Sequence, residues 1–265
     1  MKKLLSLLML IILMTGCGGE KNSGDTHSMK HSHTLVVGID EFAPFSFTDE
    51  SGQVVGFDVD LARETAKHMG VELEFRMINW SDKEHEITSG NIDMIWNGLD
   101  IMDEYKKFMI FSKPYMDNRQ IIMVKKDNPQ EIHSVGDLSG KNVAAQAGSN
   151  AEFLVNEDAY LKDSLKNFYT YPTIGESFAG LDTGDVDALI IDEIAARYEI
   201  SKHPDMFETV EVTIGSGTEY GVGFRKNNTE LRDKVQTAFD AIVRDGTAKK
   251  ISEKWFQADL IKLRR

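Results

Sequence analysis

Hydrophobic and polar positions alternate along the chain in two recurring patterns that predict a layered α/β structure. Residues 35–39 form a short, continuous apolar run, which is typical of a strand covered on both faces. Residues 56–69 place apolar side chains at helical spacing and stop at Gly70, whereas residues 71–77 alternate as in a half-buried strand. Residues 92–96 predict another apolar strand. Strands and helices in this alternating order indicate a doubly wound sheet.

The same pattern begins again further along, which predicts a second α/β unit. A strand is expected at 142–145, a helix from Ser149, and further strands at 186–191 and 219–224. Two amphipathic C-terminal helices follow, separated by a break at Asp245-Gly246. Two such units in one chain indicate two lobes, and ligands of open α/β sheets bind beyond the carboxyl ends of the strands. We therefore expect the ligand site in a cleft between the lobes.

The first residues have a different pattern, with two lysines, an apolar run over residues 4–14 and a single cysteine. The apolar run is too short to span a bilayer but suits a signal peptide. Residues 14–17 read Met-Thr-Gly-Cys, which has the form of a lipobox. We expect residues 1–16 to be a signal peptide and the mature chain to begin at a diacylated Cys17. Two acyl chains would anchor the protein at the extracytoplasmic face of the cell membrane.

A polar segment follows, and we expect residues 17–33 to form a lipidated flexible tether because they show no apolar periodicity. His27, His31 and His33 could grip a metal ion, but no cysteine or carboxylate cluster supports a closed site. A solvated linker is therefore expected, with no metal or cofactor. Lipidation of Cys17, the only cysteine, leaves none for disulfides or cysteine catalysis.

Composition narrows the class of partner. The chain has a formal net charge of −13, and this acidic balance argues against nucleic acid, whose binding needs basic patches. Apolar residues make up 41% of the chain, and no second long apolar run follows the first. We expect a globular, water-soluble body that is tethered to the membrane and monomeric.

Six short motifs occur in order between Thr34 and about Leu260. They are Glu41-Phe42-Ala43-Pro44-Phe45-Ser46-Phe47, Gly56-Phe57-Asp58-Val59-Asp60-Leu61, Ile92-Asp93-Met94-Ile95-Trp96-Asn97-Gly98, Phe111-Ser112-Lys113-Pro114-Tyr115, Gln146-Ala147-Gly148-Ser149 and Gly221-Val222-Gly223-Phe224-Arg225-Lys226. Together they resemble family 3 extracellular solute-binding proteins, which deliver amino acids to ABC importers. The resemblance implies a type II periplasmic-binding-protein architecture of two doubly wound α/β lobes. Residues 34–117 and 222–265 would form lobe 1, residues 118–221 would form lobe 2, and two chain crossings would act as the hinge.

The resemblance also implies a set of ligand-binding residues. They are Phe42, Trp80, Asn97, Gly98, Asp100, Tyr105, Gln146, Ser149, Asn150 and Asp192. Phe42 and Trp80 would form aromatic walls, although an aromatic residue at either position can equally be part of the core. Backbone groups of Gly98 would point into the cleft with the side chains of Asn97 and Asp100.

Polar groups of lobe 2 would complete the site. Ser149 and Asn150 begin a helix whose free N–H groups suit an anion, and Ser149 can also act as an N-cap. Asp192 would hold the ammonium group of the ligand, as relatives do at this strand end. Glu193 is less suited to point inward.

The chain departs from the family where relatives bind the carboxylate of an amino acid. Tyr105 replaces an arginine, Asp100 replaces Ser or Thr, and Met102 replaces Thr. A guanidinium makes two charge-assisted hydrogen bonds to a carboxylate, whereas a phenol makes one neutral bond. Two buried carboxylates without an arginine favour a cation, because an unpaired buried charge is costly. We expect a cationic amino acid in an altered pose or an amine lacking a free carboxylate, and not glutamate or aspartate.

These features predict a membrane-tethered protein that captures a small amine-bearing solute and delivers it to the permease of an ABC importer. One alternative is a ligand sensor that is presented to a membrane receptor. Another is an enzyme, since some proteins of this fold dehydrate cyclohexadienyl acids with a general acid in the cleft. The missing arginine and the lack of a catalytic cluster argue against catalysis, so we do not expect an enzyme.

Overall fold

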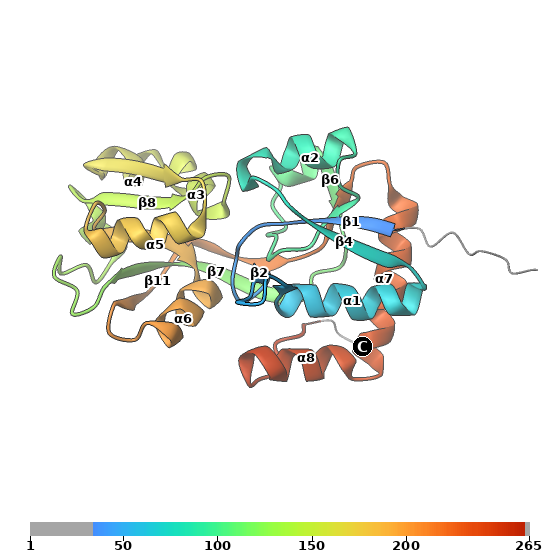
Figure 1. Cartoon of the computed structure of the whole chain (residues 1–265). Coiled ribbons are helices and arrows are strands. Elements are labelled where there is room, and N and C mark those ends of the chain that lie inside the picture. Colours follow the sequence, from blue (N-terminus) through green and yellow to red (C-terminus); the bar gives the residue numbers. More distant parts are fainter. Residues whose placement is uncertain (1–33, 263–265) are drawn as a thin grey trace, which may run out of the picture. The chain divides into compact units, whose positions relative to one another are not determined.

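The computed structural model describes residues 34–262, which belong to one compact unit. The predicted signal peptide, the tether, Cys17 and the three tether histidines lie outside the described residues. The described part contains two five-stranded sheets and one small hairpin of β2 (Phe47–Thr48) and β3 (Val54–Val55). Each sheet is flanked by helices (Figure 1). No helix in this part is long and apolar enough to cross a bilayer.

The first sheet has the strand order β4-β1-β5-β12-β6. Its strands are β1 (Thr34–Ile39), β4 (Glu72–Met77), β5 (Met94–Ile95), β6 (Met109–Phe111) and β12 (Gly223–Arg225). β1 pairs in parallel with β4 and β5, whereas β12 runs antiparallel to β5 and β6. The accompanying helices are α1 (Phe57–Met69), α2 (Lys83–Ser89), α7 (Thr229–Arg244) and α8 (Thr247–Phe256). The sheet therefore joins segments from both ends of the described chain.

The second sheet has the order β11-β7-β10-β8-β9. Its strands are β7 (Met116–Lys125), β8 (Asn142–Gln146), β9 (Asn167–Tyr171), β10 (Ala188–Asp192) and β11 (Phe207–Tyr220). β8 pairs in parallel with β9 and β10, and β7 runs antiparallel to β10 and β11. The accompanying helices are α3 (Asn150–Glu157), α4 (Ala159–Ser164), α5 (Ile174–Thr183) and α6 (Glu193–Lys202). Three single 3₁₀ turns cover Trp80–Asp82, Tyr105–Lys107 and Val135–Leu138.

β7 and β11 carry the chain between the two sheets. They pair from Phe207 with Lys125 to Tyr220 with Met116. The single strand predicted over residues 219–224 is wrong, because β11 ends at Tyr220 and β12 begins at Gly223. Gly223 pairs with strands of the first sheet, so the chain changes partners within this apolar run. A hydrophobic pattern does not record such a change.

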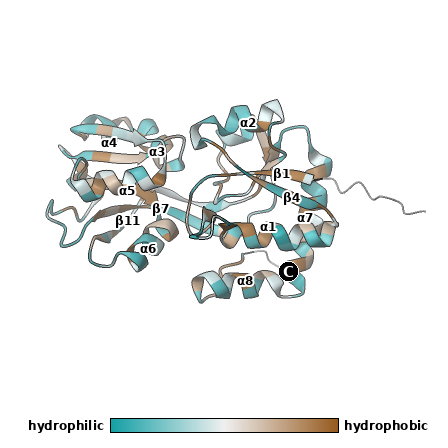
Figure 2. Cartoon of the chain, viewed as in Figure 1, coloured by the Kyte–Doolittle hydropathy of each residue, from teal (hydrophilic) through white to brown (hydrophobic). Residues whose placement is uncertain are grey.

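The alternating pattern over residues 71–77 predicts strand β4 correctly but overstates its burial. Met77 is 42% exposed, because β4 is an edge strand of its sheet and Met77 is its last residue. The apolar face predicted for α7 is confirmed, since Val235, Phe239 and Ile242 are at most 1% exposed. Apolar residues concentrate along the strands and on the helix faces turned toward them (Figure 2). Burial of these faces supplies the main stabilisation of both layers.

Candidate functional site

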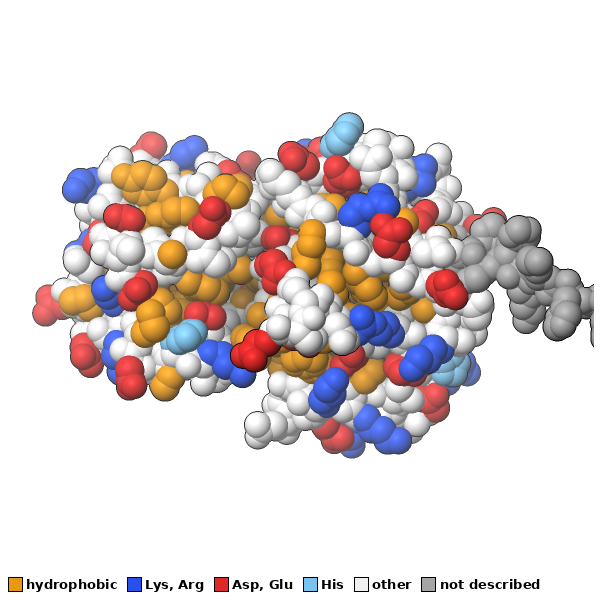
Figure 3. All heavy atoms as spheres, in the orientation of Figure 1, with side chains coloured by type: hydrophobic (Ala, Val, Ile, Leu, Met, Phe, Trp, Pro, Cys, Tyr) orange, Lys and Arg blue, Asp and Glu red, His pale blue; other side chains and the backbone are white. Residues whose placement is uncertain are grey.

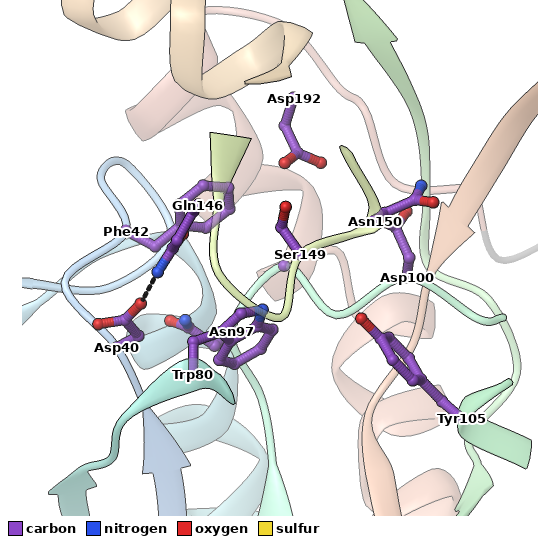
Figure 4. Close-up of a pocket in the computed structure, with 11 residues that line it drawn as sticks. Asp40, Phe42, Trp80, Asn97, Asp100, Tyr105, Gln146, Ser149, Asn150 and Asp192 are labelled. Carbon is purple, nitrogen blue, oxygen red and sulfur yellow. Dashed lines mark hydrogen bonds between the residues drawn. The ribbon is translucent and has the colours of Figure 1, made fainter. Parts of the chain in front are cut away.

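Strand ends and the turns that follow them surround a small pocket with a cavity volume of about 20 Å³ (Figure 4). Its lining residues are Asp40, Phe42, Trp80, Asn97, Gly98, Asp100, Tyr105, Gln146, Ser149, Asn150 and Asp192. All ten residues that the sequence predicts for the site are therefore brought together, and Asp40 joins them. Their contact with a ligand stays a prediction.

The first wall of the pocket begins where β1 ends, at Asp40. Asp40 Oδ1 accepts a hydrogen bond from the backbone N–H of Glu41 at 2.8 Å, and Oδ2 accepts one from the amide of Gln146. Ser46 hydrogen-bonds both the backbone carbonyl of Asp40 and the side chain of Asn97. Because β1 belongs to the first sheet and Gln146 ends β8 of the second, the Asp40–Gln146 bond joins the two sides of the pocket. Burial raises the pKa of Asp40 to about 6.

Aromatic rings form part of the same wall. Phe42 and Trp80 are each 7% exposed, and both line the pocket. Phe42 stacks on Phe45 with ring centroids 5.4 Å apart, which fixes its orientation. The faces of these rings carry partial negative charge and can therefore attract a cation.

Gly98 follows β5 in a conformation that favours glycine, with φ +55°. A Cβ atom at Gly98 would lie 2.8 Å from the ring of Phe42. The N–H of Gly98 donates to Asp58 Oδ2 at 2.6 Å, and the hydroxyl of Tyr115 donates to Asp58 at 2.9 Å. The prediction that backbone groups of Gly98 point into the cleft is therefore wrong for its N–H, which Asp58 takes. Asp58, from the first turn of α1, holds the end of β5 in place.

Asp100 is positioned by the loop after β5, which pairs with the end of β11. Its backbone forms a bridge with Tyr220. Asp100 Oδ1 accepts hydrogen bonds from Asn118 Nδ2 at 3.0 Å and from the hydroxyl of Thr218. Asn118 and Thr218 belong to β7 and β11, so a residue of the loop after β5 is held by the two strands that carry the chain between the sheets.

Asp192, the last residue of β10, meets the same crossing strands. Its Oδ1 accepts hydrogen bonds from Asn118 Nδ2, from Gln120 Nε2 at 2.9 Å and from the hydroxyl of Tyr220 at 2.7 Å. The amide of Asn118 thus links Asp100 to Asp192. Within residues 34–262, the hydrogen bonds to both carboxylates meet at Oδ1, and none is found to Oδ2. Oδ2 is therefore the oxygen of each carboxylate that can accept a hydrogen bond from a ligand.

The two linked carboxylates are destabilised in their charged form. Burial, followed by the nearby charge of Asp192, raises the pKa of Asp100 to about 7, and burial raises the pKa of Asp192. A bound cation would offset both effects. No group of three or more His, Cys, Asp or Glu that could hold a metal ion occurs in the described part of the chain.

Tyr105 lines the pocket, and Lys83 is buried behind Tyr105 and Trp80. The hydroxyl of Tyr105 donates to the carbonyl of Gly148 at 2.9 Å, so its one proton is already used. Lys83 is 4% exposed and donates to the carbonyls of Trp80 at 3.1 Å and Gly148 at 2.5 Å. Its Nζ lies 4.7 Å from the ring centroid of Tyr105. Burial lowers the pKa of Lys83 to about 8.

The N-terminus of α3 faces the pocket from the second sheet. Ser149 is its N-cap, with Oγ accepting from the backbone N–H of Glu152 at 3.2 Å. The carboxylate of Glu152 accepts from the backbone N–H of Gly148 at 2.6 Å. Asn150 is buried, and its Nδ2 has no partner among the described residues. Figure 4 places the side chain of Asn150 beside Asp100.

Asp40 and Lys83 are the residues that sequence reasoning missed. Asp40 directly follows a buried strand, which is the same signal that singled out Asp192, so it was available. Lys83 stands in a polar run from Ser81 to Glu86, and nothing in the sequence separates it from a surface lysine. Its burial follows from the way that Trp80, Tyr105 and Gly148 meet around it.

Known proteins support the assignment of the family. The model of bacterial extracellular solute-binding proteins, family 3, matches residues 35–258. The L-cystine-binding protein TcyJ of Escherichia coli K12 is 34% identical over 260 residues, which cover 96% of this chain and 95% of that protein. The probable amino-acid-binding protein YxeM of Bacillus subtilis 168 is 32% identical over 262 residues, covering 95% and 93%.

Two solved structures share the fold. One is a substrate-binding protein of an ABC uptake transporter from Streptococcus pneumoniae with bound histidine, with a TM-score of 0.82, 32% identity and coverage of 87% of this chain and 95% of that one. The other is an ancestral arginine-binding protein bound to arginine, with a TM-score of 0.79, 39% identity and coverage of 85% and 100%. These similarities confirm the predicted type II periplasmic-binding-protein fold. They also confirm that the protein is a binding protein and not an enzyme. The chain belongs to family 3 of the bacterial extracellular solute-binding proteins.

Proposed function

We propose that this protein captures a small amine-bearing solute and delivers it to an ABC importer while anchored to the membrane through a lipidated Cys17. The observation that carries the choice of ligand is the pair Asp100 and Asp192. Both carboxylates line the pocket and are linked through Asn118, and within residues 34–262 no hydrogen bond is found to Oδ2 of either. An ammonium or guanidinium group offers the donors and the charge that these oxygens lack.

The relatives favour the same class of ligand. Their names include cystine, histidine and arginine, all of which carry an ammonium group. Among residues 34–262, however, no lysine or arginine lines the pocket to receive a carboxylate. A dicarboxylic amino acid is therefore the ligand that the lining disfavours most.

A thermal-shift screen tests the ligand class. The panel would contain amino acids, simple amines and dicarboxylic acids, each at about 100 times its dissociation constant or at the highest soluble concentration. A ligand at that excess stabilises the folded protein by about 2.7 kcal/mol, which is easily measured. Amine-bearing compounds should raise the melting temperature, whereas glutamate and aspartate should not. Tight binding of glutamate or aspartate would contradict the proposal.

The lipid anchor is tested separately by replacing Cys17 with serine. Without the thiol there is no acceptor for the acyl chains, so the variant should stay unprocessed or be shed from the membrane. The measurement is the fraction of protein in washed membranes. An equal fraction for the wild type and Cys17→Ser would rule out the anchor but not the ligand class.

A further inference from the structure

The pocket contains more negative charge than one ammonium group can offset. Asp40, Asp100 and Asp192 line it, and each is at most 8% exposed. The lining contains no lysine or arginine, and Lys83, behind Trp80 and Tyr105, supplies one positive charge nearby. When all three are ionised, three carboxylates and one lysine leave two negative charges without a partner. By contrast, lysine and arginine side chains are scattered over the face of the molecule in Figure 3.

Within residues 34–262, the lining offers a carboxylate no positively charged donor, and three of its neutral donors are already used. The hydroxyl of Tyr105 donates a hydrogen bond to the carbonyl of Gly148, and the amide of Gln146 donates one to Asp40. The backbone N–H of Gly98 donates a hydrogen bond to Asp58. A ligand carboxylate would therefore compete with bonds that the protein already makes, and it would do so next to buried negative charges.

The N-terminus of α3 does not change this conclusion. Glu152 places its own carboxylate there, on the N–H of Gly148. The hydroxyl of Ser149 and the amides of Asn97 and Asn150 donate no hydrogen bond within residues 34–262, but these donors are neutral, and Figure 4 shows Asn150 beside Asp100. An anion held by Asn150 would therefore lie close to the carboxylate of Asp100, where repulsion opposes it.

We propose that the pocket takes a small organic dication without a carboxylate, such as a diamine or an aminoalkyl guanidine. This inference deepens the proposed function and rests on it. One cationic group binds Asp100 and Asp192, whose Oδ2 atoms accept no hydrogen bond within residues 34–262, and the other binds Asp40. In Figure 4 Asp40 and Asp100 lie on opposite sides of the pocket, so an extended molecule can reach both ends. Phe42 and Trp80 cover the cationic groups with their ring faces.

Matched pairs of ligands test the proposal, because removal of the carboxylate is then the only chemical change. The pairs are arginine with agmatine and lysine with cadaverine, and pentylamine serves as the monocation matched to cadaverine. Isothermal titration should give dissociation constants at least about tenfold lower for agmatine and cadaverine than for the two amino acids. Cadaverine should also bind at least about tenfold more tightly than pentylamine. The proposal is overturned if an amino acid binds as tightly as its decarboxylated partner. It is also overturned if pentylamine and cadaverine have equal dissociation constants.

Variants then locate the two charges. Tyr105→Arg adds a cation at the pocket and should reverse the preference within the arginine and agmatine pair. Asp40→Asn should reduce the advantage of cadaverine over pentylamine to less than about threefold. Asp103→Asn is the control, because Asp103 is 97% exposed and outside the pocket, and it should leave every constant unchanged.

The outcomes separate this inference from the proposed function. If arginine or lysine binds and their decarboxylated partners do not, the inference of a dication without a carboxylate is wrong. The proposed function, capture of an amine-bearing solute, is then retained. If no amine of any kind binds but a dicarboxylic acid does, both are wrong. An unchanged arginine-to-agmatine preference in a folded Tyr105→Arg variant would also count against the charge argument.

Discussion

Asp192 and Glu193 are neighbours in the sequence but belong to opposite electrostatic environments. Asp192 faces the pocket, where its hydrogen-bond donors are neutral and its pKa is raised by burial. Glu193 begins α6 and is bound by two arginines, Arg119 at 2.6 Å and Arg197 at 2.7 Å. These hydrogen bonds, that with Arg119 first, lower the pKa of Glu193 to about 2. Arginines are thus available next to the pocket but are paired on its outer side, which leaves the pocket carboxylates to a ligand.

Replacement of Asp192 should have the largest effect on ligand affinity and would show directly whether Asp192, unlike Glu193, contacts the ligand. Loss of one partner of a buried, hydrogen-bonded charge pair costs about 2–5 kcal/mol. Asp192→Asn should therefore weaken binding of the best amine in the screen by about 30-fold or more, as measured by isothermal titration. Binding within threefold of the wild type would mean that Asp192 does not contact the ligand.

The pH dependence of ligand affinity in the wild type should reflect the pocket carboxylates Asp100 and Asp192 and not Glu193. Asp100, with a pKa of about 7, and Asp192, with a raised pKa, must be ionised to bind a cation. Affinity should therefore rise from pH 5 to pH 8, by at most about tenfold per unit for one group below its pKa, and binding should release protons. Glu193 does not titrate in this range. Titrations in buffers of different ionisation enthalpy measure the protons, and uptake of protons would contradict the assignment.

The stability of the ligand-free protein should change with pH in the opposite direction to the affinity for an amine. The folded-state pKa of Asp100 and that of Asp58 are each about 7, above the ordinary value of 3.8. Their contribution to stability is therefore fully present below about pH 3.8 and is lost as pH rises through about 7. Thermal melts of wild type and Asp100→Asn without ligand check this. Asp100→Asn should lose less stability than wild type between pH 4 and pH 7, and parallel curves would contradict the burial argument.

Asp58 sharpens the comparison, since it is a buried carboxylate that does not line the pocket. Its bonds to Gly98 and Tyr115 hold the end of β5. Asp58→Asn leaves at least one of these groups without a proper partner, at a cost of about 1–3 kcal/mol. The melting temperature should fall while the preference among amines stays the same. An unchanged melting temperature, equal to that of the exposed control Asp103→Asn, would show that Asp58 has no positioning role.

The smallest effect on stability and affinity is expected from a substitution of Glu193, on the outer side of the pocket. Glu193→Gln removes the charge that Arg119 and Arg197 share, but these side chains are partly exposed and screened by solvent. We expect about 0–1 kcal/mol of stability to be lost and less than a twofold change in affinity. A large loss of binding would indicate that Glu193 orients Asp192, and the two regions would then not be independent.

The sequence by itself determined the layered α/β class and the residues that surround the pocket. Local patterns were sufficient for the class, because a buried strand or an amphipathic helix is written in a few neighbouring residues. The resemblance to the family implied ten of the eleven lining residues, five of them within the ordered motifs. The replacement of the carboxylate-binding arginine by Tyr105 was also readable, since Tyr105 lies a few residues after a motif that aligns the chain with the family.

Only the tertiary structure decided how these residues are paired. The end of β11 at Tyr220, the burial of Lys83 and the link through Asn118 all depend on residues far apart in the chain. The same holds for the use of the Gly98 N–H by Asp58. Burial and hydrogen-bond partners are properties of the folded pocket, and they decide which carboxylates keep an oxygen free for a ligand.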